Sequence, residues 1–170
     1  LIGLFPGSRA REIRKMFPVM IETARRLSQS NPTLRFQVAA ASEQLAYEMS
    51  EMLTAETLAD RRAIEITVGQ TASIMQRAFV GIVASGSATL EAAYFGMPFV
   101  LIYKVAWPTY VAARLVVNVD FLGMPNLLAG KEVVPEFIQH QAKPGTIVKA
   151  VQLLMEDSPA RDRMILDFNT

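Results

Sequence analysis

The chain has 170 residues, of which 51% are hydrophobic, and it carries a net charge of +1 with one histidine and no cysteine. A chain of this length can bury the core of one compact domain. The near-zero net charge argues against a broad nucleic-acid-binding surface, and the absence of cysteine excludes disulfides and thiolate metal sites. The longest uncharged runs, 79–90 and 92–103, are too short to span a bilayer, so we expect no transmembrane helix.

Apolar strand-like runs alternate with helix-like patterns along the chain. The expected strands are 1–5, 34–40, 64–68, 80–84 and 98–103. The expected helices are 10–29, 42–54, 71–78, 88–95, 108–117, one near 135–140, and 144–156. Repeated strand–helix units with nearly continuous apolar strands predict an α/β fold, namely a Rossmann-like parallel sheet with helices on both faces.

The first helical segment presents one apolar stripe. Its apolar residues recur at three- and four-residue spacings and are Ile13, Met16, Phe17, Met20, Ile21, Ala24 and Leu27. Pro18 interrupts this pattern and removes one backbone hydrogen bond. We therefore expect a kink or a late helix start at this position.

The N-terminus lies inside the first apolar run. The chain begins with Leu1 rather than Met, and nothing near it resembles a signal peptide. We therefore expect residues 1–170 to be a single domain excised from a longer protein.

Residues 84–91 read as a strand end, a turn of small residues and the start of a helix. At such a junction, free N–H groups and the positive end of the helix dipole favour a bulky anion. The candidate ligand contacts in this segment are Ser85, Gly86, Ser87, Ala88, Thr89 and Glu91. Three of them supply hydroxyl groups, and the Glu91 carboxylate could accept hydrogen bonds from a sugar. The segment predicts a site for a nucleotide diphosphate.

A second strand–turn–helix junction, Phe-Pro-Gly-Ser-Arg, covers residues 5–9. Its candidate phosphate contacts are Gly7, Ser8 and Arg9, because a guanidinium can bind phosphate through two parallel hydrogen bonds. This loop alone is equally consistent with a turn and helix cap. Two such loops at one sheet edge favour binding of a diphosphate between them. Neither loop has the P-loop or dinucleotide-binding spacing, which argues against a nucleotide hydrolase or a simple dehydrogenase.

Other polar residues are open to two interpretations. Tyr103 and Lys104 end a strand at the same edge, where Lys104 is either a second phosphate cation or a solvated charge. Asn126 lies among apolar residues, and this position favours a buried structural role over a ligand contact. His140 is expected at the surface or at a helix end. With one histidine, no cysteine and no closely spaced aspartates, we expect no metal and no cofactor. The apolar stripe within 107–115 is expected in the core rather than on a lipid surface.

Four motifs in this order resemble those of the lipid-A-disaccharide synthase family. They are Phe-Pro-Gly-Ser-Arg with Glu-Ile within 5–13, the segment 84–93, Pro-Asn-Leu-Leu-Ala-Gly at 125–130 and Val-Pro-Glu at 134–136. The match extends over nearly the whole chain. Two positions depart from the family pattern. Gly123-Met124 replaces Ser-Leu, so no role of that serine is carried over, and Ser87 replaces a threonine but keeps the hydroxyl.

The resemblance implies the C-terminal, donor-binding half of a GT-B glycosyltransferase, in which two Rossmann-like domains face one cleft. It implies a metal-independent, inverting transfer of 2,3-diacylglucosamine from UDP to 2,3-diacylglucosamine 1-phosphate, which yields lipid A disaccharide 1-phosphate and UDP. The Gly7–Arg9 loop and the Ser85–Thr89 turn would hold the diphosphate, and Glu91 would hold the ribose. Asn126 becomes a candidate catalytic residue, while the general base is expected in the missing N-terminal half.

The resemblance also implies a cytoplasmic enzyme of lipid A and lipopolysaccharide biosynthesis in Gram-negative bacteria. It allows a peripheral contact with the cytoplasmic face of the inner membrane and implies no nucleic-acid partner. The chain alone is expected to bind UDP weakly and to catalyse nothing. Two alternatives remain open: another GT-B enzyme, such as a peptidoglycan N-acetylglucosaminyltransferase or a UDP-sugar epimerase, and a non-catalytic nucleotide-binding module. The motifs at 125–130 and 134–136 disfavour the first.

Overall fold

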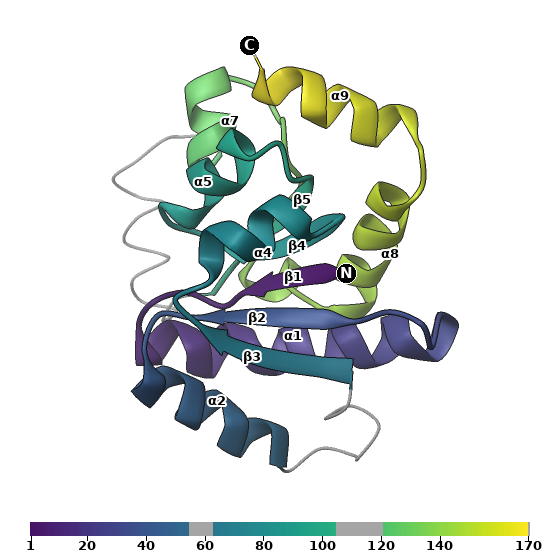
Figure 1. Cartoon of the computed structure of the whole chain (residues 1–170). Helices are drawn as coiled ribbons and strands as arrows, with labels where there is room; N and C mark the ends of the chain where they lie inside the picture. Colours follow the sequence, from purple (N-terminus) through teal and green to yellow (C-terminus); the bar gives the residue numbers. More distant parts are fainter. Residues whose placement is uncertain (55–62, 105–120, 170) are drawn as a thin grey trace.

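In the computed structural model, a six-stranded parallel sheet lies between helices (Figure 1). The structure describes residues 1–54, 63–104 and 121–169. The strands are β1 (Ile2–Phe5), β2 (Phe36–Ala40), β3 (Ile64–Val68), β4 (Val80–Ala84), β5 (Phe99–Tyr103) and β6 (Glu136–Ile138). Their order is β3-β2-β1-β4-β5-β6, and every neighbouring pair is parallel. This arrangement confirms the predicted Rossmann-like fold.

The helices cover both faces of the sheet, because the central strands are apolar on both sides. They are α1 (Ala10–Ser30), α2 (Glu43–Thr54), α4 (Thr71–Arg77), α5 (Ala88–Tyr94), α7 (Met124–Ala129), α8 (Pro144–Met155) and α9 (Pro159–Phe168), with a 3₁₀ turn η1 at Gln139–Gln141. On one face α1 packs against α2 and α8, while α4 and α5 pack together on the other (Figure 1). All residues of β1 and β4 are buried, as expected for strands between two helical layers. No helix in the described ranges combines the length and hydropathy needed to cross a bilayer.

The predicted apolar stripe of α1 is confirmed. All seven predicted members, Ile13, Met16, Phe17, Met20, Ile21, Ala24 and Leu27, are buried. Of the two alternatives expected at Pro18, the late start is wrong, because α1 begins at Ala10 and continues through Pro18, whereas the kink stays a prediction. A proline inside a helix costs about 3 kcal/mol. Burial of apolar residues on both sides of Pro18 offsets this cost, and the proline itself lies on the exposed side.

The C-terminal third differs from the sequence-based prediction. The predicted helix near 135–140 is wrong: this segment forms β6 and η1, because pairing with β5 provides backbone partners that a short isolated helix would lack. The predicted turn at 124–128 is the short helix α7. The prediction also missed α9, although Ser158 followed by Pro159 is a recognisable helix start. The Ser158 Oγ accepts a hydrogen bond from the Arg161 N–H at 3.2 Å. The predicted helix 108–117 lies outside the described residues.

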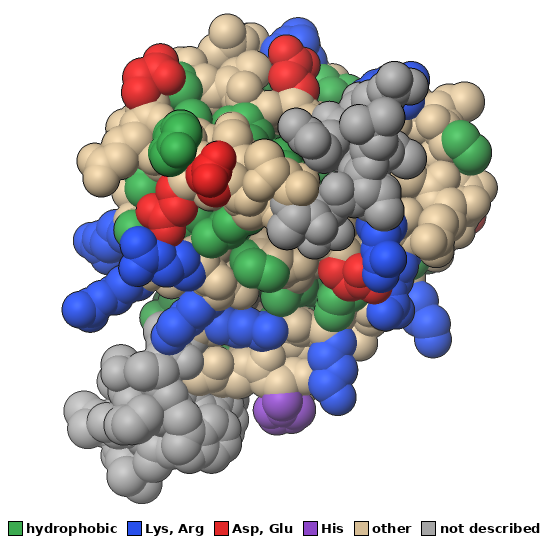
Figure 2. Space-filling view, turned by 90° about the horizontal axis from the view of Figure 1, so that it is seen from below, with side chains coloured by type: hydrophobic (Ala, Val, Ile, Leu, Met, Phe, Trp, Pro, Cys, Tyr) green, Lys and Arg blue, Asp and Glu red, His purple; other side chains and the backbone are tan. Residues whose placement is uncertain are grey.

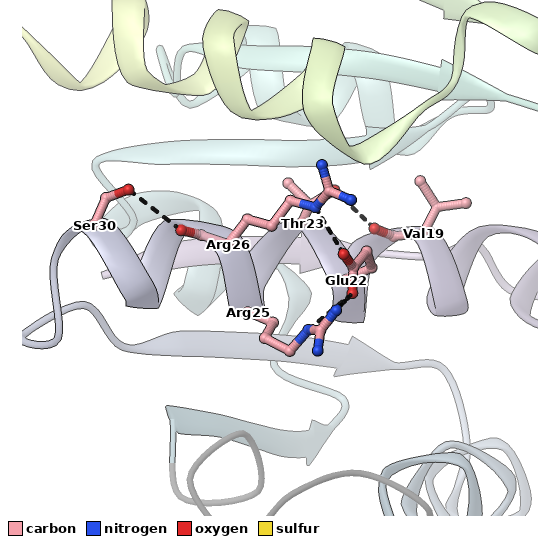
Figure 3. Close-up of polar contacts among 6 residues, drawn as sticks. All are labelled: Val19, Glu22, Thr23, Arg25, Arg26 and Ser30. Atoms are coloured by element: carbon pink, nitrogen blue, oxygen red, sulfur yellow. Dashed lines mark hydrogen bonds and ion pairs between the residues drawn. The ribbon is translucent and has the colours of Figure 1, made fainter.

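Glu22 is the centre of an ion-pair cluster on α1 (Figure 3). Its carboxylate accepts hydrogen bonds from Arg26 Nε at 2.7 Å and from Arg25 Nε at 2.8 Å. The hydrogen bond from Arg26, followed by the smaller effect of Arg25, lowers the pKa of Glu22 below its ordinary value although partial burial opposes the shift. Folding therefore favours the ionised carboxylate.

We expect Glu22→Gln to lower the Tm at neutral pH, and this difference to shrink under acidic conditions. Because the folded-state pKa is depressed, the stabilisation is fully present above the ordinary pKa of 4.5 and is lost as the pH falls through the lower folded-state value. Thermal unfolding of both proteins between about pH 3 and pH 7 measures the effect. The assignment fails if the Tm difference is the same at both ends of this range.

Candidate functional site

The turns after β1 and β4 lie side by side because these two strands are neighbours in the sheet. Their register pairs Ile2 with Val80 and Phe5 with Val83, so both strands end at the same edge. The chain order of the strands reverses here, with β2 and β3 on one side and β5 and β6 on the other. The crevice at such a reversal is the usual ligand site of an open α/β sheet. The two predicted phosphate loops therefore flank this crevice.

A pocket of about 420 Å³ opens between the two turns. Its volume lies within the range of about 300–1,000 Å³ that is typical of small-molecule sites. The predicted contact residues in its lining are Gly7, Ser8, Arg9, Ser85, Gly86, Ser87, Ala88, Glu91 and Tyr103. The structure thus brings most of the predicted site residues to one cavity.

The β1–α1 turn depends on the glycine at its centre. Gly7 has φ of 107°, a region that other residues rarely adopt. A Cβ at this position would lie 2.9 Å from the Glu12 Cβ and still closer to the Glu12 Oε2 atom. The backbone of the turn therefore packs directly against the first turn of α1.

Arg9 is the N-cap residue of α1 and supplies the cation of the pocket. Its side chain is 82% exposed and makes no capping hydrogen bond. Its contact in the structure is with Glu12, whose Oε1 atom lies 3.4 Å from the Arg9 Nη1 atom. A contact of this length is weak, so the guanidinium keeps most of its N–H donors for a ligand.

The β4–α5 turn presents backbone N–H groups to the pocket. The Ser85 N–H donates to β5 at 3.0 Å, and the Thr89 N–H donates to the Gly86 carbonyl at 3.1 Å. Among the described residues, we find no acceptor for the N–H groups of Gly86, Ser87 and Ala88, all of which line the pocket. A Cβ added to Gly86 would meet no atom within 4 Å, so the space beside this backbone is open to a ligand. These N–H groups can therefore donate to an anion.

Two predicted contacts do not line the pocket. Thr89 is fully buried, and its hydroxyl donates to the Gly86 carbonyl at 2.7 Å, so it closes the turn. Lys104 is partly buried beyond the end of β5, and only its neighbour Tyr103 reaches the lining. His140 is exposed in η1, as predicted, and the single histidine is visible at the surface in Figure 2.

Six residues of the lining were not among the predicted contacts. Phe5 and Ala84 are the last residues of β1 and β4, directly before the two turns, and the others are Glu12, Ala39, Ala41 and Thr71. Ala39 and Ala41 lie at the end of β2, and Thr71 begins α4 after β3. Their positions after strands are the only signal that could have indicated them, because an alanine carries no reactive group. The sequence did not indicate Glu12 as a pocket residue, because an acidic residue in the first turn of a helix is ordinarily explained by its interaction with the helix dipole. The pocket thus contains Arg9 together with two carboxylates, Glu12 and Glu91.

Asn126 belongs to a buried hydrogen-bond network rather than to the lining of this pocket. Its amide oxygen accepts the N–H groups of Val133 at 2.7 Å and Val134 at 2.8 Å. Its amide nitrogen donates to the Val134 carbonyl at 2.7 Å and to Glu136 Oε1 at 2.8 Å. The side chain is 0% exposed, and its hydrogen-bonding capacity is fully used. The sequence allowed a buried structural role or a ligand contact for Asn126, and this geometry supports the structural role.

The same network explains why two sequence motifs occur together. Glu136 also accepts the N–H groups of Leu122 at 3.0 Å and Gly123 at 2.8 Å, which lead into α7. The motif at 125–130 is thereby tied to the motif at 134–136. The catalytic assignment of Asn126 gains no support from this arrangement, because no group of its amide is left for a substrate.

We expect Asn126→Ala to lower the free energy of unfolding by about 2–4 kcal/mol, because buried N–H groups lose their acceptor. Asn126→Asp keeps both acceptor sites but places a second carboxylate beside Glu136, so it should also destabilise the protein. Urea unfolding followed by circular dichroism measures both changes. The matched control is Asn169→Ala, which alters an exposed amide at the end of α9. A loss for Asn126→Ala as small as that of the control would exclude the structural role.

Comparison with known proteins identifies the family. The model of the family described as lipid-A-disaccharide synthetase matches residues 1–167. The lipid-A-disaccharide synthase of Geobacter sulfurreducens is 36% identical over 92% of this chain, and that of Acidobacterium capsulatum is 38% identical over 96%. The chain spans 40% and 42%, respectively, of the length of these curated relatives.

Solved structures support the fold independently of sequence. The ADP-heptose lipopolysaccharide heptosyltransferase II of E. coli has a TM-score of 0.62 at 14% identity, over 91% of this chain and 46% of its own. The pneumococcal O-GlcNAc transferase GtfA, solved with UDP and GlcNAc, has a TM-score of 0.57 at 16% identity, over 99% of this chain and 31% of its own. Such low identities show the fold alone. This fold agrees with the Rossmann-like fold predicted for one half of a GT-B enzyme. Together with the match of the family model over nearly the whole sequence, it shows that the chain belongs to the lipid-A-disaccharide synthase family.

Proposed function

We propose that this chain is the C-terminal, donor-binding half of a lipid-A-disaccharide synthase and that its pocket holds the UDP part of the nucleotide sugar. The observation that carries the proposal is the pairing of β1 with β4, which places Arg9 and the N–H groups of two turns around one cavity. A diphosphate needs convergent N–H donors and a cation, and the cavity provides both.

Different residues of the pocket would bind the diphosphate and the ribose of the donor. Arg9 and the N–H groups of Gly86, Ser87 and Ala88 would neutralise the diphosphate. Glu91 is exposed in the first turn of α5 and lines the same cavity, so its carboxylate can accept hydrogen bonds from the ribose hydroxyls.

The proposed reaction transfers 2,3-diacylglucosamine from UDP to 2,3-diacylglucosamine 1-phosphate. A hydroxyl oxygen of the acceptor bonds to the anomeric carbon, the bond from that carbon to the diphosphate breaks, and the hydroxyl proton passes to a base. UDP leaves with the electron pair of the broken bond. Arg9 and the two turns would stabilise the charge that develops on the diphosphate without a metal ion.

The acceptor site and the general base are assigned to the remainder of the enzyme. The chain spans about two fifths of its curated relatives, and its family membership supports the presence of a second half in the complete enzyme. The donor pocket opens at the carboxyl edge of the sheet, where a second Rossmann-like domain would face it across a cleft. A peripheral contact of the complete enzyme with the inner membrane is part of the same proposal, since both of its sugar substrates carry acyl chains.

We expect the 170-residue chain to bind UDP weakly, with a Kd in the range of roughly 0.1–1 mM, because only one wall of the cleft is present. It should form no disaccharide, because the base and acceptor site are absent. Isothermal titration calorimetry and a radiolabelled transfer assay measure these two properties. No UDP binding at millimolar ligand would contradict the donor site, and disaccharide formation by the chain alone would contradict the assigned division of roles.

We expect Arg9→Ala in the complete enzyme to lower kcat/KM by roughly 10- to 100-fold, since a charge-assisted contact to the leaving diphosphate is lost. Glu91→Ala should raise the KM for the donor roughly tenfold through loss of the ribose contact. Steady-state kinetics with varied donor concentration measure both effects.

The matched controls remove like charges outside the pocket. Arg11→Ala changes an exposed arginine two positions along α1, and Glu51→Ala changes an exposed glutamate near the end of α2. Both controls should leave kcat/KM within about twofold of the wild type. Unchanged activity of the two pocket variants, with folding intact, would favour a non-catalytic nucleotide-binding module.

A further inference from the structure

The pocket contains a negative charge of its own at the place proposed for the diphosphate. Glu12 Oε2 accepts the Ser8 N–H at 3.1 Å, and Glu12 Oε1 lies 3.4 Å from Arg9 Nη1. Ser8 and Arg9 belong to the turn that is proposed to hold a phosphate. The carboxylate therefore occupies the Ser8 N–H and lies beside the Arg9 guanidinium, both of which the diphosphate would use.

The local fold brings this carboxylate close to the turn. Glu12 is the acidic residue in the first turn of α1, and the N-cap side chain of Arg9 makes no capping bond. The absence of a side chain at Gly7 leaves the space that the Glu12 side chain fills. A carboxylate at a helix N-terminus is stabilised by the same dipole and N–H groups that attract a phosphate. Glu12 thus resembles an internal substitute for the ligand.

We infer that Glu12 is a built-in competitor of the diphosphate, which lowers the affinity of the pocket for nucleotide and leaves the turn when phosphate binds. This inference rests on the proposed donor site. A carboxylate and a phosphate that share the Ser8 N–H and the Arg9 guanidinium would repel each other, and the phosphate has the greater charge and more acceptor oxygens. The Glu12 side chain is 31% exposed, so a change of rotamer can move it from the turn toward solvent.

The competition has a consequence for turnover. Displacing Glu12 weakens the binding of donor and of UDP by a similar amount, because both carry the diphosphate. Weaker product binding favours release of UDP, a step that limits the rate of many enzymes. Glu12 would therefore set the affinity of the site without contacting the reacting atoms.

Glu12→Gln tests the inference, because glutamine keeps the length of the side chain and can still accept the Ser8 N–H. The negative charge is lost, and one of the two acceptor oxygens is replaced by an NH2 group. We expect UDP and inorganic pyrophosphate to bind roughly three- to fivefold more tightly to this variant than to the wild type. Uridine, which has no phosphate, should show the same affinity for both proteins. The gain should shrink at about 1 M salt, where the charge is screened. Isothermal titration calorimetry measures all three ligands.

Two further variants separate competition from a general effect of charge or folding. Glu22→Gln removes the same charge from the same helix but outside the pocket, and it should leave UDP affinity unchanged. Glu12→Ala removes both the charge and the acceptor for Ser8, so it should bind UDP more tightly but unfold at a lower temperature. Circular dichroism establishes that each variant is folded.

If folded Glu12→Gln binds UDP and pyrophosphate as tightly as the wild type or more weakly, the inference is overturned. This holds even if the Tm of the variant is lower, because Glu12 would then act only as a helix cap. A wild-type protein that binds pyrophosphate but not UDP would overturn the proposed nucleotide site, while tighter pyrophosphate binding by Glu12→Gln would still support competition. Binding of neither ligand by the wild type would overturn both proposals.

Discussion

The parallel pairing of β1 with β4 is the constraint on which the rest of the site depends. The two strands are about 75 residues apart in the sequence, yet their register ends them at the same edge of the sheet. Both are buried between helical layers, so slippage of either strand would disrupt its backbone hydrogen bonds and the packing of its apolar side chains. One pocket between two turns follows directly from this pairing, since each turn alone would present only a few N–H groups to solvent.

Two polar clusters of the structure differ in how many of their hydrogen-bonding groups already have a partner within the protein. Around Asn126, every hydrogen-bonding group of the amide has a protein partner, and the cluster is buried. Such a saturated network holds α7 to β6 and has no capacity left for a ligand. Around Arg9, the guanidinium is exposed and its contact with Glu12 is long. An open cluster of this kind stabilises the fold little but can exchange its internal anion for an external one.

Family membership and local geometry support the proposal in different ways. The match of the family model covers nearly the whole chain, whereas the chain covers only about two fifths of its curated relatives. In the proposed function, the pocket would recognise a nucleotide diphosphate and would form one wall of a two-domain cleft. Binding of the donor can therefore be argued from this chain, while the proposed function assigns proton transfer and recognition of the acceptor to residues outside it.

The sequence by itself determined the strand–helix alternation, the parallel sheet and the turns that follow β1 and β4, because these depend on local patterns of apolar, small and hydroxyl residues. It did not determine the strand order, which arises from contacts between distant segments. It indicated a helix where pairing with β5 instead produces β6, and it allowed two roles for Asn126 that only the positions of Val133, Val134 and Glu136 distinguish. The place of Glu12 in the pocket was likewise decided by the tertiary structure. A carboxylate in a first helical turn has the same sequence signature whether it merely caps the helix or occupies the site of a ligand.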